Sequence, residues 1–154
     1  MSAVLSAAPA AWIDGAAARP LLLRNAGSKP LRLWADLLAE GSSRTPGAPC
    51  WHEVAFYRTE ANQIAVALRF VPDAEAGSGV HRARVFLSLD DAAEWLENFD
   101  PVGDLAAGFD VSDTRLSAAC VALKAAALRD RAEQLGRAYR GLIGEVLFRL
   151  ETDG

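Results

Sequence analysis

The sequence predicts an α+β fold: a three-stranded antiparallel meander with a helix before it, a short helix after it and a long C-terminal helix. Apolar residues alternate with other residues over about 51–59, 62–71 and 80–89, as in strands that bury one face. From about 113 to 151 they recur at steps of four and three, as along one side of a helix. With 154 residues, 51% of them hydrophobic, the chain 1–154 can bury such a core as a single domain.

The segment before the predicted sheet divides into a lead-in and a helix. Residues 1–28 are rich in alanine and are expected to be extended or loosely structured, with "RPLLLRN" as a short edge strand. In "LRLWADLLAE" the spacing of Leu31, Trp34 and Leu38 predicts an N-terminal helix that Gly41 ends. The following "GSSRTPGAPC" is expected to be a loop.

One face of the predicted sheet is apolar and should be core. Along the middle strand it consists of Ile64, Val66, Leu68 and Phe70. On the third strand we expect the row containing Ala83 and Val85 to share that face. The other face then collects five candidate binding residues, namely Trp51, Tyr57, Arg69, Arg82 and Arg84.

Two interpretations of this second face compete. Aromatic rings stack on bases and guanidinium groups pair with phosphate, so the face suits a single-stranded nucleic acid. Alternatively, Ala55, Ala65 and Ala67 make the face shallow so that the C-terminal helix packs on it. We favour the covered face because the helix has a wide apolar stripe that needs a partner.

The stretch "SLDDAAEWLENFDP" predicts the short helix, with Ser88 or Asp90 as its N-cap. Acidic residues dominate this region, since no basic residue lies between Arg84 and Arg115. Basic residues dominate from Arg115 to Arg149. We interpret the acidic stretch as a solvated surface; pairing with the basic helix and docking on a basic partner are the alternatives.

The C-terminal helix carries the strongest periodic pattern. Its candidate interaction residues are Leu128, Leu135, Tyr139, Leu142 and Val146. A helix over 113–151 would be about 57 Å long, which exceeds what a domain of this size covers. Part of its apolar stripe therefore needs either a kink near Gly136 or another chain.

The order helix, three-stranded meander, helix over about 30–99 resembles that of double-stranded RNA-binding domains. Those domains carry a lysine-rich cluster at the start of the second helix. This sequence has the acidic "LDDAAEWLE" there, which opposes phosphate. The resemblance is one of topology, and no family is inferred from it.

Sequence motifs give little support for catalysis. His52 and His81, with Cys50 and Glu53, follow no metal-ligand spacing, so no metal and no cofactor are expected. Cys50 and Cys120 are expected to be reduced structural thiols. The N-terminal stretch has no basic residue before Arg19 and no apolar run could span a bilayer, which predicts a cytoplasmic protein without membrane contact.

These patterns lead to one functional hypothesis and one alternative. The first is a non-enzymatic protein–protein interaction module whose C-terminal helix mediates homodimerisation or docking to a larger assembly. The alternative is a nucleic-acid-associated regulatory module that uses the aromatic and basic face of the sheet.

Overall fold

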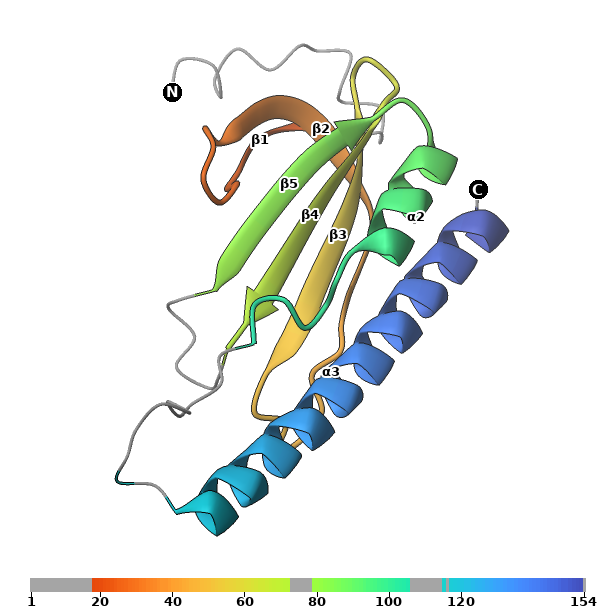
Figure 1. Ribbon diagram of the computed structural model, residues 1–154. Coiled ribbons are helices and arrows are strands. Elements are labelled where there is room, and N and C mark those ends of the chain that lie inside the picture. The colour runs from red at the N-terminus through yellow and green to blue at the C-terminus, as the bar shows by residue number, and fades with distance from the viewer. Residues whose placement is uncertain (1–17, 73–78, 106–114, 116, 154) are drawn as a thin grey trace.

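The computed structural model describes residues 18–72, 79–105, 115 and 117–153, and shows a curved antiparallel sheet with helices on one side (Figure 1). The predicted three-stranded sheet is wrong in its strand number, because the sheet has five strands in the order β1-β2-β3-β4-β5. The elements are β1 (Arg19–Leu23), β2 (Leu31–Ser42), β3 (Trp51–Thr59), β4 (Ile64–Val71), β5 (Val80–Phe86), α2 (Leu89–Asn98) and α3 (Ala118–Asp153).

The three predicted strands are confirmed as β3, β4 and β5, and the predicted edge strand as β1. The predicted N-terminal helix is wrong, because Leu31–Ser42 is a strand paired with β1 on one side and β3 on the other. The apolar residues of β2 are spaced as they would be in a helix, for two reasons. The register shifts between Leu37 and Ala39, which interrupts the alternation, and both faces of β2 are partly buried. The topological resemblance to RNA-binding domains, which needed that helix, is therefore lost.

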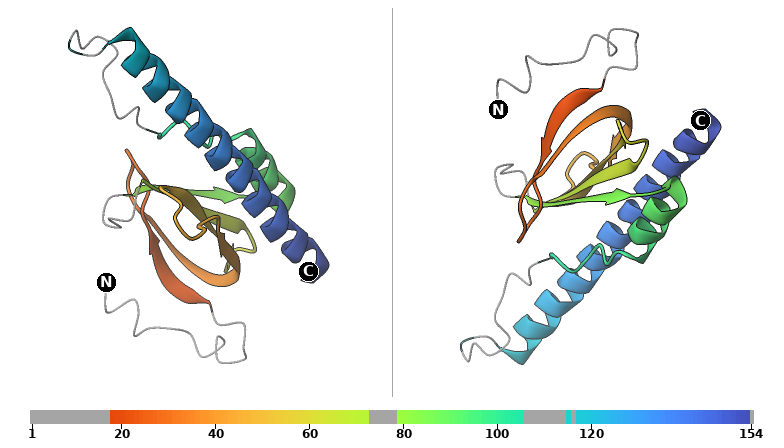
Figure 2. Two further views of the ribbon diagram at one scale, coloured as in Figure 1. Left: turned by 90° about the horizontal axis from the view of Figure 1, so that it is seen from below. Right: turned by 90° about the horizontal axis from the view of Figure 1, so that it is seen from above.

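The sheet curls into a half-barrel because β1 and β2 bend over its inner face (Figure 2). The turn after β1 reaches the opposite edge strand. Ala26 donates its backbone N–H to the His81 carbonyl at 2.6 Å, and Ala83 donates its N–H to Asn25 Oδ1 at 3.3 Å. These two bonds tie both edges of the sheet together at one end, so the inner face becomes the lining of a hollow.

Both helices pack on the outer face of the sheet. The core between them contains Val54, Phe56, Ile64, Val66, Leu68, Ala92, Leu96, Tyr139, Leu142, Ile143 and Val146. Tyr139 Oη donates a hydrogen bond to the Leu96 carbonyl at 2.5 Å, which joins α3 to α2. The apolar face is therefore core as predicted. The expectation that α3 covers the alanine face is wrong, because α3 lies on the opposite side.

The N-cap of α2 and the presence of a long C-terminal helix agree with the predictions from the sequence. Ser88 is the N-cap of α2, and its side chain accepts a hydrogen bond from the Asp91 N–H. The long C-terminal helix is confirmed as α3. It continues through Gly136 without the kink that was one of the two alternatives for its length (Figure 1). Among the described residues, neither helix has a stretch long and apolar enough to cross a membrane. Residues 1–17, most of the predicted lead-in, lie outside the described part of the chain.

Candidate functional site

The five sheet residues proposed for binding do not share one face. Trp51, Tyr57 and Arg69 lie on the inner face, whereas Arg82 pairs in register with Leu68 and Arg84 with Val66 on the helix-covered face. Residues directly opposite each other on neighbouring strands project to the same side. The assignment of β5 was therefore inverted: Ala83 faces the inside, and Phe86 packs against the core.

Arg82 has a structural contact on the outer face. Its guanidinium binds the carboxylate of Asp104, with Nη2 at 3.0 Å from Oδ1, and lies over the Phe99 ring at 5.0 Å. The hydrogen bond from Arg82 lowers the pKa of Asp104 below its usual range. Arg82 thus fastens the loop after α2 to β5. Arg84 is exposed and lies 5.8 Å from the Phe86 ring centre.

Trp51 is held inside the structure. It is 4% exposed, donates Nε1–H to Glu53 Oε2 at 3.2 Å, and has the Arg44 guanidinium 4.6 Å above its ring. A base cannot stack on a ring that is buried and already covered. The nucleic-acid hypothesis required the five residues to form one accessible surface, and they do not form one.

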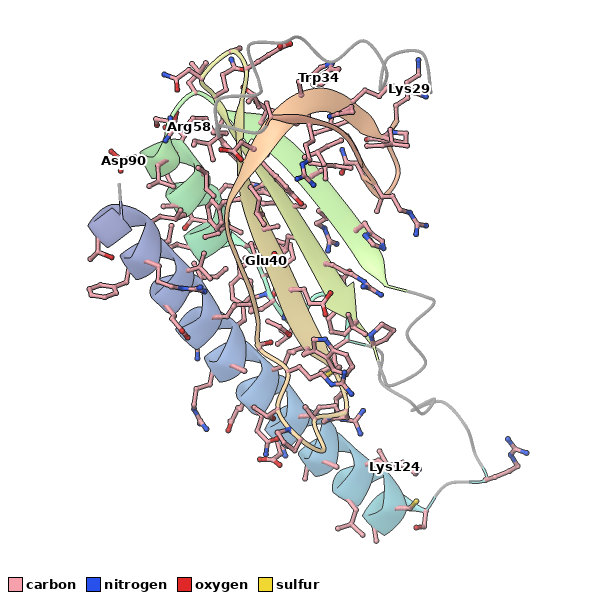
Figure 3. The ribbon with its side chains drawn as sticks, turned by 180° about the vertical axis from the view of Figure 1, so that it is seen from behind. Lys29, Trp34, Glu40, Arg58, Asp90 and Lys124 are labelled. Carbon is pink, nitrogen blue, oxygen red and sulfur yellow. The ribbon has the colours of Figure 1, made fainter. Side chains whose placement is uncertain are left out.

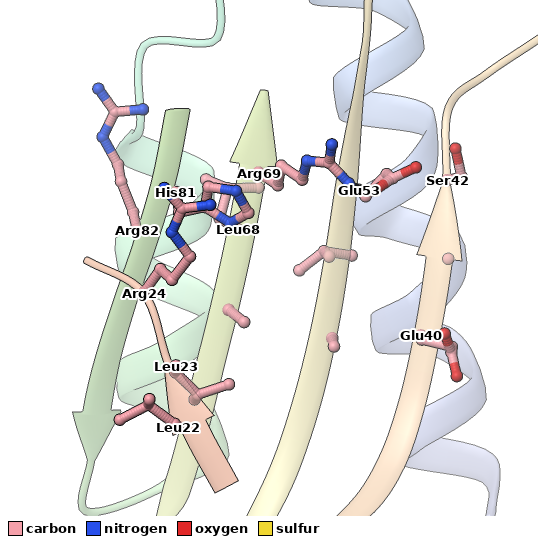
Figure 4. Close-up of a pocket in the computed structure, with 14 residues that line it drawn as sticks. Leu22, Leu23, Arg24, Glu40, Ser42, Glu53, Leu68, Arg69, His81 and Arg82 are labelled. Carbon is pink, nitrogen blue, oxygen red and sulfur yellow. Dashed lines mark hydrogen bonds and ion pairs between the residues drawn. The ribbon is translucent and has the colours of Figure 1, made fainter. Parts of the chain in front are cut away.

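The inner face contains a hollow of about 530 Å³, which we call the inner pocket (Figure 4). Ala55 and Ala67 form part of its floor, and Leu22 and Leu23 of β1 form a wall. Its polar lining includes Arg24, Glu40, Ser42, Glu53, Arg69 and His81. The volume lies within the range of about 300–1,000 Å³ that is usual for small-molecule sites.

A polar row crosses the floor of the inner pocket. Ser42, Glu53, Arg69 and His81 are successive register partners on β2 to β5. Arg69 Nη1 lies 3.2 Å from Glu53 Oε1 in an ion pair. Burial, then the positive charges of Arg24 and Arg69, lower the pKa of His81, while Glu53 opposes them. The imidazole is therefore neutral at neutral pH and lies near two guanidinium groups.

The two histidines lie on opposite sides of the sheet. His52 projects outward and is enclosed by Phe70, Phe99 and Tyr139, whereas His81 lines the inner pocket. The sheet thus separates His52 from His81 and Glu53, which lie on its inner face. Within the described ranges, no group of three or more His, Cys, Asp or Glu side chains is arranged to hold a metal ion. Both cysteines are free thiols.

Four of the five candidate interaction residues on α3 belong to the chain's own core. Leu135, Tyr139, Leu142 and Val146 are at most 6% exposed. Leu128 differs because it lies in the first part of α3, where none of the residues 118–130 is buried. We call residues 118–130 the projecting segment, since this end of α3 extends beyond the sheet (Figure 1).

The sequence did not reveal the contribution of β1 and β2 to the inner pocket. The run of three leucines predicts β1 as an edge strand but not its bend over the inner face, so Leu22, Leu23 and Arg24 are not among the predicted site residues. Glu40 is not among them because its segment is predicted as a helix. No protein-family model, curated protein or solved structure matches the chain.

Proposed function

We propose that the protein is a non-enzymatic interaction module whose projecting segment binds an acidic amphipathic helix of a partner protein. The observation that carries the proposal is the division of α3 into a buried half and a half that the sheet does not reach. At 1.5 Å per residue the 36 residues of α3 extend about 54 Å. The first buried residue of the helix is Leu135, so about half of its length, residues 118–134, precedes the part that the sheet buries.

The apolar stripe of α3 continues across this division. Val121, Ala125, Leu128 and Ala132 follow the same four-and-three spacing as the buried Leu135, Tyr139, Leu142 and Val146. They are partly exposed, in contrast to the buried residues that continue the stripe. The alanines among them allow a second helix to approach closely, so a partner helix would extend the existing core past the edge of the sheet.

The charges beside the stripe support an acidic partner. At 100° per residue, Lys124 and Arg131 border the stripe on one side and Arg129 borders it on the other. Asp130 and Glu133 lie farther round the helix. Lys124 lies on the part of α3 that extends past the sheet (Figure 3). Two copies of this chain paired through the stripe would bring their basic residues together, whether the two helices were parallel or antiparallel. A partner helix with glutamates beside its apolar seam would instead complement these basic residues.

Binding of designed helical peptides tests the proposal. One labelled peptide carries leucine at the seam positions and glutamate at the flanking positions, and its matched control carries lysine at the flanks. Fluorescence anisotropy should detect binding of the acidic peptide, weakened by salt, and much weaker binding of the basic one. Leu128→Glu should abolish binding and Arg129→Glu should reduce it.

The matched control variant is Arg137→Glu, which makes the same charge change on α3 but on the side away from the stripe. It should bind the acidic peptide nearly as well as the unaltered protein. Equal binding of both peptides, or equal loss in Arg129→Glu and Arg137→Glu, would contradict the proposal. So would a stable dimer in light scattering that Leu128→Glu dissociates, because the occupant would then be a second copy.

A further inference from the structure

We infer that the inner pocket is a binding site for a small organic carboxylate with a short apolar body. This site lies on the opposite side of the sheet from α3 and is independent of the proposed docking of a helix. Three features carry the inference: an open hollow of suitable size, a positive charge at one end, and an apolar floor beside it.

The hollow is produced by the fold and by its small side chains together. The bend of β1 over the inner face supplies Leu22 and Leu23 as a wall, and the bonds from Asn25 and Ala26 to β5 hold that wall in place. Beneath it, Ala55 and Ala67 face each other across β3 and β4. Larger residues at these two positions would fill the space that the curl encloses.

The charges at the end of the pocket formed by Arg24, Arg69, Glu53 and His81 do not cancel. Glu53 is paired with Arg69 and also accepts the Trp51 indole N–H, so its carboxylate is already bound by two donors. Arg24, which is exposed, has no carboxylate at ion-pair distance among the described residues. With His81 neutral, the group formed by Arg24, Arg69, Glu53 and His81 keeps one net positive charge.

The positive charge is local to this end, because Glu40 also lines the pocket and balances it over the lining as a whole. Arg82 is neutralised by Asp104 on the outer face. Glu40 lies on β2, across the pocket from Arg24 (Figure 4), and its negative charge contributes to the raised pKa of Tyr57. The cationic end is therefore Arg24 together with the neighbouring His81.

A carboxylate fits this end and the floor fits what is attached to it. A guanidinium offers two parallel N–H donors to a carboxylate, and a neutral imidazole adds one further N–H donor. An aliphatic or aromatic body placed behind the carboxylate would lie on Ala55 and Ala67 against Leu23. A bare anion would use only the charged end, and a neutral analogue only the apolar floor.

Alanine-methyl NMR provides the test. Protein labelled at its alanine methyl groups is titrated with hexanoate, with hexanamide and with acetate, and the Ala55 and Ala67 signals are followed. Hexanoate should produce saturable shifts at millimolar concentration, acetate weaker ones, and hexanamide almost none. Arg24→Gln should weaken hexanoate binding about tenfold, as expected for loss of a charge-assisted bond.

Two further variants make the result specific. Lys29→Gln removes the same charge from an exposed position in the β1–β2 turn, and it should bind hexanoate like the unaltered protein. Ala67→Leu should block binding by filling the floor, with the Ala55 methyl as the reporter and circular dichroism as the check on folding. Absence of saturable shifts with hexanoate, equal shifts with hexanamide, or an unchanged affinity in Arg24→Gln would each overturn the inference.

Discussion

His52 provides the sharpest prediction about stability. Its side chain is 0% exposed, and neither ring nitrogen has a hydrogen-bond partner among the described residues. The ring lies between Phe70, Phe99 and Tyr139, at centroid distances of 5.3, 6.3 and 5.0 Å. Burial lowers the pKa of His52 to about 4; Asp104 raises it and Arg82 lowers it further. The folded protein therefore keeps this imidazole neutral at a pH where the unfolded chain protonates it.

The sign and size of the effect follow from this difference. Because the folded pKa is below the unfolded value of 6.5, the contribution of His52 is present above about pH 6.5 and is lost as the pH falls towards 4. A change from 6.5 to about 4 corresponds to roughly 3 kcal/mol of unfolding free energy. Between pH 7 and pH 4.5, the unaltered protein should lose roughly 2 to 3 kcal/mol through this residue alone.

Urea unfolding of the unaltered protein and of His52→Phe at several pH values measures this loss. The variant removes the titrating group and both unpaired nitrogens, while its larger ring has to fit the same space. The difference in unfolding free energy between pH 7 and pH 4.5 should therefore shrink by roughly 2 to 3 kcal/mol. His81→Gln, which removes the other histidine, should keep most of it. Superimposable pH profiles for His52→Phe and the unaltered protein would refute the argument.

Other substitutions test the packing of the helices by thermal unfolding. Gly41→Ala should destabilise the protein by about 1–3 kcal/mol, since the new Cβ would lie 2.8 Å from Leu142 Cδ1; an unchanged melting temperature would mean that α3 does not approach β2 so closely. Gly141→Ala should stabilise it by about 1 kcal/mol, because that exposed helical position has no atom within 4 Å of the added methyl. Ser88→Ala should cost about 1 kcal/mol through loss of the α2 cap, and Ser88→Asp should restore most of it.

The central strands and α3 could be predicted because each has one consistently buried side. Val54 and Phe56 in β3, like Val66 and Leu68 in β4, face the same helices along the whole strand, so the period of two survives in the sequence. In α3 the four-and-three spacing also continues into the part that the sheet does not bury. The periodicity therefore predicted the helix, but it could not indicate where along the helix burial by the sheet ends.

β2 and β5 depart from the prediction for two different physical reasons. β2 is paired at both edges, and its bulge shifts the alternation after Leu37. In β5 the outer row contains Arg82, Arg84 and Phe86, and the inner row contains the small Ala83. The charged groups of the arginines reach beyond the edge of the core, so this polar row can lie on the core side of the sheet. The sequence pattern alone assigns a polar row to the opposite face.

The same sequence feature explains both the curvature of the sheet and the hollow within it. On the inner face, Ala55, Ala67 and Ala83 are register partners on β3, β4 and β5, and Ala65 lies beside Ala67 on the same side of β4. The outer face holds bulky residues such as Phe56 and Leu68. A sheet with small residues inside and large ones outside can bend towards its small side, because few side chains collide there. The bend carries β1 over the alanines and encloses the inner pocket. A substitution such as Ala67→Leu should therefore act on the ligand site and on sheet curvature together, whereas Arg24→Gln should act on the ligand site alone. That difference is the reason to base the test of the carboxylate site on Arg24.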